Sequence, residues 1–176
     1  WTNTVNQPDL IDVYKIVTNA DKTQYRMDGK WKPLQQKRIW LPVKFGPFNL
    51  PVPKTVYRSE HGLVIINKNG AFAIRYAAMD DVKLLEQYFR IQKAENYDQW
   101  VAAMSKRGIP ATNFIYADKT GKIGYFYNAV FPNRQPGFDY TKILPGDVSA
   151  SLPQGVLPWS ATPMIVDPAS GYVTNA

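Results

Sequence analysis

Two aspartates near the start of the chain, Asp9 and Asp12, are spaced three residues apart and enclose Leu10 and Ile11. Carboxylate and carbonyl oxygens are the ligands that hard cations such as calcium prefer. The spacing by itself is more typical of two exposed aspartates where a strand begins. A glycosidase pair is not expected, because its two carboxyl groups must lie across a cleft rather than on one short segment. The pair is a candidate cation site whose other ligands the spacing does not identify.

The chain contains one histidine, His61, and no cysteine. The lack of cysteine excludes a disulfide scaffold, a thiolate zinc site and a cysteine nucleophile. A Ser-His-Asp triad or a multi-histidine metal site would depend on His61 alone. Chemistry of either kind is therefore not expected from these residues.

The two terminal segments are further candidates. Residues 1–6 place small polar side chains around Val5, which is typical either of a strand edge that lines a polar pocket or of an ordinary edge strand. Residues 167–176 predict a turn followed by a strand. Neither segment identifies a reaction by itself.

Length and charge restrict the classes of protein that must be considered. With 176 residues, 45% of them hydrophobic and 20% charged, residues 1–176 are expected to form a single domain with a sizeable core. No apolar run approaches the roughly 20 residues of a membrane span. The net charge of +7 comes from lysines and arginines spread singly or in pairs such as Lys37-Arg38. This spread favours a basic solvated face over a nucleic-acid site.

Strand patterns dominate the elements that must position these residues. Residues 10–18 and 38–45 are rich in β-branched and aromatic side chains. Three hairpins are predicted where glycine supplies a turn between such runs, at Asp28-Gly29, Asn69-Gly70 and Thr120-Gly121. A mainly β fold of the α+β class follows.

Helices are predicted only in the middle of the chain. Asp80 or Asp81 can cap a helix whose apolar residues include Leu85 and Phe89. Asn96 begins a second helix, with Gln99 completing a capping box. Residues 132–168 contain seven prolines and predict a long ordered loop.

Four motifs, in this order, resemble the penicillin acylase (penicillin amidase) family, which belongs to the N-terminal nucleophile hydrolases. They are W-T-x-T-V-N-x-P-D-x-x-D-V-Y from Trp1, S-E-H-G-x-V from Ser59, Y-A-D-x-x-G-x-I-G-Y from Tyr116 and D-P-x-S-G-Y-V-T-N-A from Asp167. The first motif is most similar to the acyl-homoserine lactone acylases of that family. Leu63 departs from the pattern, because the family prefers proline there, and His61 is expected to be structural. The resemblance implies that the chain forms part of a four-layer αββα sandwich.

The resemblance also implies a mechanism. Family members are precursors that cut themselves into an α and a β chain, and the new N-terminal serine of the β chain is the nucleophile. These residues are expected to be an internal part of the β chain, inactive without that serine. Val5 matches the position whose backbone N–H forms half of the oxyanion hole. Asn175 matches the first asparagine of a T-N-x-N-N motif, in which the catalytic asparagine would follow Ala176.

Binding residues carry over in the same way. Asp9, Asp12 and the backbone carbonyls of Ile11 and Pro132 match the calcium positions of the family. Met79 and Thr112 match positions that line the acyl pocket.

The resemblance implies that the complete protein hydrolyses N-acylated small molecules of the β-lactam or acyl-homoserine lactone type. The expected partners are the α chain and the rest of the β chain, and the expected location is the periplasm. The alternatives are a non-catalytic binding module for an acyl or carbohydrate ligand and, less favoured by the charge pattern, a basic nucleic-acid binder.

Overall fold

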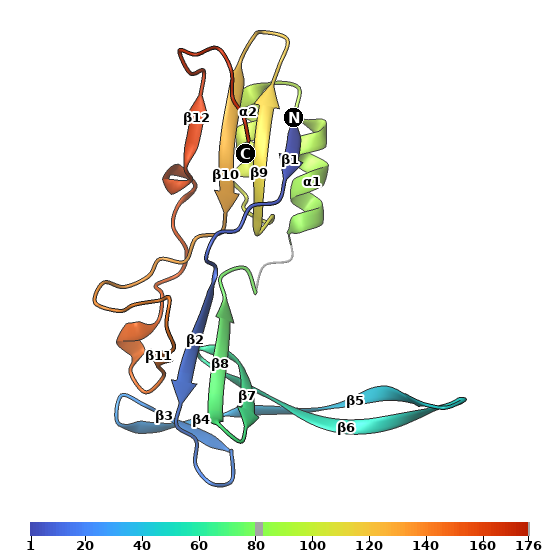
Figure 1. Ribbon diagram of the computed structural model, residues 1–176, viewed down its shortest axis with the longest axis vertical. Helices are drawn as coiled ribbons and strands as arrows, with labels where there is room; N and C mark the ends of the chain where they lie inside the picture. Colours follow the sequence, from blue (N-terminus) through green and yellow to red (C-terminus); the bar gives the residue numbers. More distant parts are fainter. Residues whose placement is uncertain (80–82, 176) are drawn as a thin grey trace. The chain divides into compact units, whose positions relative to one another are not determined.

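The computed structural model describes residues 1–79 and 83–175, and the chain divides into two compact units (Figure 1). Unit 1 contains the described residues of 1–10, 77–133 and 154–176, and unit 2 contains residues 11–76 and 134–153. The expectation of a single domain concerns how the whole chain folds, and it stays a prediction. Among the described residues, no helix has the length and apolar character needed to cross a membrane.

Unit 1 is built on a four-stranded antiparallel sheet with two helices packed against one face. The strand order is β1-β9-β10-β12, and the bounds are β1 (Thr2–Thr4), β9 (Ala111–Ala117), β10 (Ile123–Ala129) and β12 (Met164–Val166). Helices α1 (Leu84–Lys93) and α2 (Tyr97–Met104) lie beside this sheet (Figure 1). The register places Phe114 of β9 opposite Phe126 of β10, so both rings face the helices.

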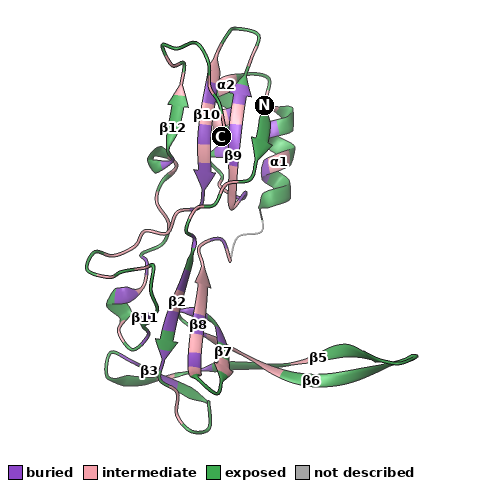
Figure 2. Cartoon of the chain, viewed as in Figure 1, coloured by how far each residue is buried: buried purple, intermediate pink, exposed green. Residues whose placement is uncertain are grey.

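The core of unit 1 is aromatic and centres on Trp100 of α2. The Trp100 ring centroid lies 6.0 Å from that of Phe114, 5.0 Å from that of Tyr116 and 4.9 Å from that of Phe126. Figure 2 shows buried residues along β9 and β10, and Trp100, Ala103 and Met104 of α2 are buried as well. This packing fixes α2 on the sheet.

The predicted start of α2 is confirmed, with a small change in the capping box. The side chain of Asn96 accepts a hydrogen bond from the Gln99 amide at 3.0 Å. The side-chain oxygen of Gln99 accepts in return from the amide of Glu95 at 2.9 Å, one residue before the N-cap. The predicted caps of α1, Asp80 and Asp81, lie outside the described residues.

Unit 2 contains a six-stranded sheet and a two-stranded hairpin. The sheet order is β11-β2-β8-β7-β6-β5, and only the β11–β2 pair in this described sheet is parallel. The bounds are β2 (Ile11–Ile16), β5 (Gln35–Phe45), β6 (Phe48–Ser59), β7 (Gly62–Asn67), β8 (Gly70–Tyr76) and β11 (Leu144–Pro145), with β3 (Gln24–Met27) and β4 (Lys30–Pro33) forming the hairpin. The core of unit 2 includes Tyr14, Tyr25, Met27 and Leu144.

All three predicted hairpins are confirmed, as β3–β4, β7–β8 and β9–β10. The strand predicted after the turn near Gly171 is wrong for the described tail, where residues 167–175 form turns and irregular backbone. The tail contacts the sheet through a side chain: the side-chain amide of Asn175 donates a hydrogen bond to the hydroxyl of Thr4 in β1. Most of residues 132–168 is the predicted ordered loop, interrupted by the short strands β11 and β12.

His61 is buried in unit 2 between two tyrosine rings. Its ring centroid lies 4.8 Å from that of Tyr14 and 6.0 Å from that of Tyr25. Neither ring nitrogen has a hydrogen-bond partner among the described residues. Burial is the main reason that the pKa of His61 falls from 6.5 to about 4.

We expect this histidine to make unit 2 sensitive to acid. The unfolded chain binds a proton at His61 below pH 6.5, whereas the folded chain binds it only near pH 4. The free energy of unfolding should therefore fall as the pH decreases from 6.5 to 4, by about 2 kcal/mol between pH 7 and pH 5. Urea unfolding at both pH values should show this loss in the native chain and a smaller loss in His61→Leu. Equal losses in the two chains would contradict it.

Candidate functional site

A polar cluster lies on the sheet of unit 1, on the face turned away from the helices. We call it the Asn113 cluster, and it consists of Thr4, Val5, Asn113, Tyr125 and Asn175. Because side chains alternate along a strand, Asn113 points away from the face to which Phe114 contributes. Antiparallel pairing of β1 with β9 sets Thr4 opposite Asn113.

Asn113 joins the two terminal segments through its amide group. Its Nδ2 donates to the backbone carbonyl of Val5 at 3.3 Å and to Oδ1 of Asn175 at 3.0 Å. Its Oδ1 accepts from the Tyr125 hydroxyl at 2.9 Å. The amide of Asn175 also donates to the Thr4 hydroxyl. Residues at opposite ends of the chain are thus held at one place.

The cluster is buried at its centre and open at Val5. Asn113 is 5% exposed, whereas Val5 is 84% exposed. Burial raises the pKa of Tyr125, and the neighbouring Tyr127 adds to this, so the hydroxyl stays protonated as a donor. A network of neutral dipoles around an open backbone segment can orient a backbone donor toward a developing negative charge.

The sequence identified Val5 and Asn175 separately but did not identify Asn113 and Tyr125 as their link. Tyr125 ends the third motif, yet its contact with Asn113 depends on the pairing register of β9 and β10. The signal that could have found Asn113 is a polar residue among the apolar residues of a predicted strand.

The predicted acyl-pocket residues, Met79 and Thr112, are both half-buried residues of unit 1. Thr112 lies opposite Asn128 in the β9–β10 pair, and its hydroxyl donates to the carbonyl of Ala111. Asn128 is buried, and its Oδ1 has no hydrogen-bond partner among the described residues. Met79 lies in the turn after β8. Their role in substrate binding stays a prediction.

The predicted calcium ligands are divided between the units, since Asp9 and Pro132 belong to unit 1 and Ile11 and Asp12 to unit 2. Asp12 is 1% exposed, and its Oδ1 accepts from Nε and Nη2 of Arg134 at 3.0 and 2.7 Å. Within residues 1–79 and 83–175, no three acidic, histidine or cysteine side chains are grouped as a metal site would need. Convergence of the four predicted ligands stays a prediction.

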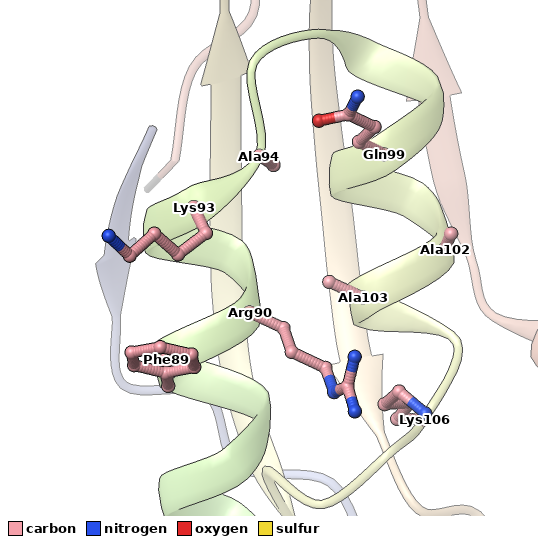
Figure 3. A pocket seen from close by; sticks show the side chains of 8 residues that line it. All are labelled: Phe89, Arg90, Lys93, Ala94, Gln99, Ala102, Ala103 and Lys106. Carbon is pink, nitrogen blue, oxygen red and sulfur yellow. The ribbon is translucent and has the colours of Figure 1, made fainter.

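A separate groove of about 340 Å³ lies between α1 and α2 (Figure 3). Its walls combine Phe89, Gln99 and three alanines with three cationic side chains, Arg90, Lys93 and Lys106. The Arg90 Nε is 2.7 Å from the Glu86 carboxylate, so part of this charge is neutralised. The groove contains none of the residues predicted from the motifs.

Comparison with known proteins gives consistent matches. The family model described as penicillin amidase matches residues 1–176. Penicillin G acylase of Escherichia coli is 30% identical over 99% of this chain and 21% of its own length. Acyl-homoserine lactone acylase PvdQ of Pseudomonas fluorescens (strain Pf0-1) is 28% identical over 76% of this chain and 18% of its own length.

A solved structure gives the same result for the fold. Thermostable penicillin G acylase from Alcaligenes faecalis superposes with a TM-score of 0.85 and 26% identity, covering 99% of this chain and 32% of that chain. The predicted α+β class, mainly β and part of an N-terminal nucleophile hydrolase fold, is confirmed. This chain spans about a fifth of the curated relatives and about a third of the solved chain.

Proposed function

Because this chain belongs to the penicillin amidase family, we propose that it forms part of an acylase that hydrolyses the amide bond of N-acylated small molecules. Both relatives described above are named acylases, which supports amide hydrolysis as the reaction class. In the proposed mechanism, an N-terminal serine outside these residues attacks the amide carbonyl and passes its hydroxyl proton through its own amine to the leaving amine as the C–N bond breaks. Water then hydrolyses the acyl-enzyme, which releases the free acid and restores the serine.

The observation that carries this proposal is the link between Val5 and Asn175 through Asn113. Attack on an amide carbonyl places negative charge on its oxygen, which preorganised N–H donors stabilise. We assign one such donor to the backbone N–H of Val5. The second would be an asparagine side chain shortly after Asn175. Asn113 would then position both segments without touching the substrate.

Replacing Asn113 by alanine in the full-length acylase should lower kcat between about tenfold and a hundredfold, because small displacements of catalytic groups have effects of that size. KM should change little. Steady-state kinetics provide the measurement, with Tyr125→Phe expected to show a smaller loss of kcat in the same direction.

The matched control is Asn69→Ala, which changes an exposed asparagine in the β7–β8 turn of unit 2. It should leave kcat unaltered. If Asn113→Ala lowers kcat but also lowers the melting temperature and raises KM, the role of Asn113 is merely structural.

We propose that Met79 and Thr112 contact the acyl group. Both a penicillin G acylase and an acyl-homoserine lactone acylase are similar to this chain, so the two substrate classes to compare are aromatic acyl amides and acyl-homoserine lactones. Release of the free acid from one class by the purified full-length protein supports amide hydrolysis and identifies the acyl class. A correctly processed protein that hydrolyses neither class would refute the proposed reaction.

We also propose a structural calcium ion bound by Asp9, Asp12 and the carbonyls of Ile11 and Pro132. The donor set fits, since all four ligands are oxygens and two are carboxylates. Arg134 neutralises part of the Asp12 charge and should weaken binding. A chelator should lower the melting temperature of the full-length protein, and Asp9→Asn should reduce that effect. No change on chelation would contradict the site.

The proposed partners are an α chain and the remaining β-chain residues of the same precursor. Periplasmic location is proposed from the family resemblance alone. Cell fractionation with an antibody against this chain tests it, and recovery in the cytoplasm would contradict it.

A further inference from the structure

The hairpin of β5 and β6, at one edge of the sheet of unit 2, extends well past the other strands of that sheet (Figure 1). Strands β5 and β6 pair along their whole length, from Gln35 opposite Arg58 to Phe45 opposite Phe48. Strand β6 pairs with β7 at three residues, Tyr57, Arg58 and Ser59. We call residues 37–56 the arm, because in the described structure these residues of the two strands pair with each other alone.

The register divides the arm into two chemically different faces. Successive residues of each strand point to opposite faces, and we call the face that carries Phe45 and Phe48 face A. Its outer part is apolar on both strands, and its base carries two lysines, Lys37 and Lys54. The apolar residues of its outer part are Leu41, Val43, Phe45, Phe48, Leu50 and Val52. The opposite face contains Arg38, Lys44, Asn49 and Thr55 among prolines and Trp40.

The apolar residues of face A are exposed, with fractions from 37% for Val43 to 70% for Phe45 and Phe48. Figure 2 shows most of the arm in the colour of exposed residues. A two-stranded hairpin has little stability in water by itself, and a contiguous exposed apolar surface usually marks an interaction site. Face A is therefore expected to be covered by another layer of protein.

We propose that face A docks on a segment of the same acylase that lies outside these 176 residues, and that this segment is apolar with acidic side chains at its border. The proposal rests on family membership rather than on the proposed amidase reaction. The curated relatives are about five times as long as the stretch they share with this chain, so such a protein supplies ample covering chain.

Charge selects between the segment and a second copy of the arm. Residues 35–59 contain five lysines and arginines and no acidic residue. Two arms packed through face A in the same direction would bring the cations at their bases toward one another, which is unfavourable. Two arms packed head to tail would set the lysines of each base against the apolar tip of the other, which leaves those charges without a partner. Carboxylates next to Lys37 and Lys54 would instead form ion pairs at the border of an apolar contact.

Cysteine labelling tests whether face A is covered in the full-length acylase. Leu50→Cys should react with a maleimide at least about tenfold more slowly than Asn49→Cys, since labelling requires the contact to open. Asn49 is the adjacent residue on the opposite face, which makes it the matched control. Phe48→Cys provides a second face A probe if Leu50→Cys does not fold. Equal labelling of the two faces would overturn the proposal.

Zero-length carbodiimide cross-linking of the native protein identifies the occupant. A link from Lys37 or Lys54 to an Asp or Glu of the same polypeptide outside these residues is the expected result. Links between copies, together with protection that is lost on dilution, would show that a second copy covers the arm and would overturn the proposal. Neither measurement depends on amidase activity.

Discussion

A Val5→Pro substitution in the full-length acylase is expected to lower kcat by about 10²–10³, the effect of removing one oxyanion donor. Proline has no backbone N–H, so the substitution removes the proposed donor atom itself. The residue before a proline favours extended backbone, and Thr4 already lies in strand β1. The Val5 side chain is largely exposed, so its loss should affect stability little. Steady-state kinetics on the preferred acyl substrate provide the measurement.

The matched control at the same position is Val5→Ala, which keeps the N–H and removes only side-chain atoms. It should retain kcat within about twofold, because the proposed donor is kept and the side chain that is shortened is exposed. Similar kcat values for Val5→Pro and the native enzyme would show that the oxyanion is bound elsewhere. A loss of kcat in Val5→Ala comparable to that in Val5→Pro would show that the side chain matters instead.

Local signals account for the elements that the sequence predicted well. Asp28-Gly29 and Asn69-Gly70 stand between runs of strand-forming residues, and both turns form with glycine at positive φ. Asn96 and Gln99 start α2 because their side chains satisfy backbone amides at the helix end. Such features depend on a few neighbouring residues, and this is why they can be predicted from the sequence.

Strand β6 was not predicted, although it is one of the longest strands of unit 2. Pro51 and Pro53 indicate a strand interruption, since proline cannot donate a ladder hydrogen bond. In the arm, however, β6 pairs only with β5, so the edge of β6 away from β5 needs no N–H donor for a ladder hydrogen bond. The prolines therefore fit the observed position, which depends on tertiary structure.

The site shows the same division between local and long-range information. Motifs identified Val5 and Asn175, whereas the role of Asn113 depends on the pairing of β1 with β9 and on the path of the tail. The Arg134 contact with Asp12 joins residues 122 positions apart, and no local pattern predicts it. Family resemblance supplied the candidates, and the structure supplied the residue that holds two of them.

The second large effect is expected for stability, at Trp100. Replacing Trp100 by alanine should reduce the free energy of unfolding by about 3–5 kcal/mol, the usual range for deleting a large aromatic side chain from a core. The reason is that the ring is 1% exposed and packs on three aromatic rings of β9 and β10.

Two further variants separate this effect from other consequences of losing a tryptophan. Trp100→Phe should cost less, because the indole N–H has no hydrogen-bond partner among the described residues and only ring contacts are lost. Trp40→Ala, at a position 61% exposed on the face of the arm opposite face A, should change the free energy of unfolding by about 0.5 kcal/mol or less. Urea unfolding measures all three. Comparable losses at Trp40 and Trp100 would mean that the aromatic cluster of α2, β9 and β10 is not the main core of unit 1.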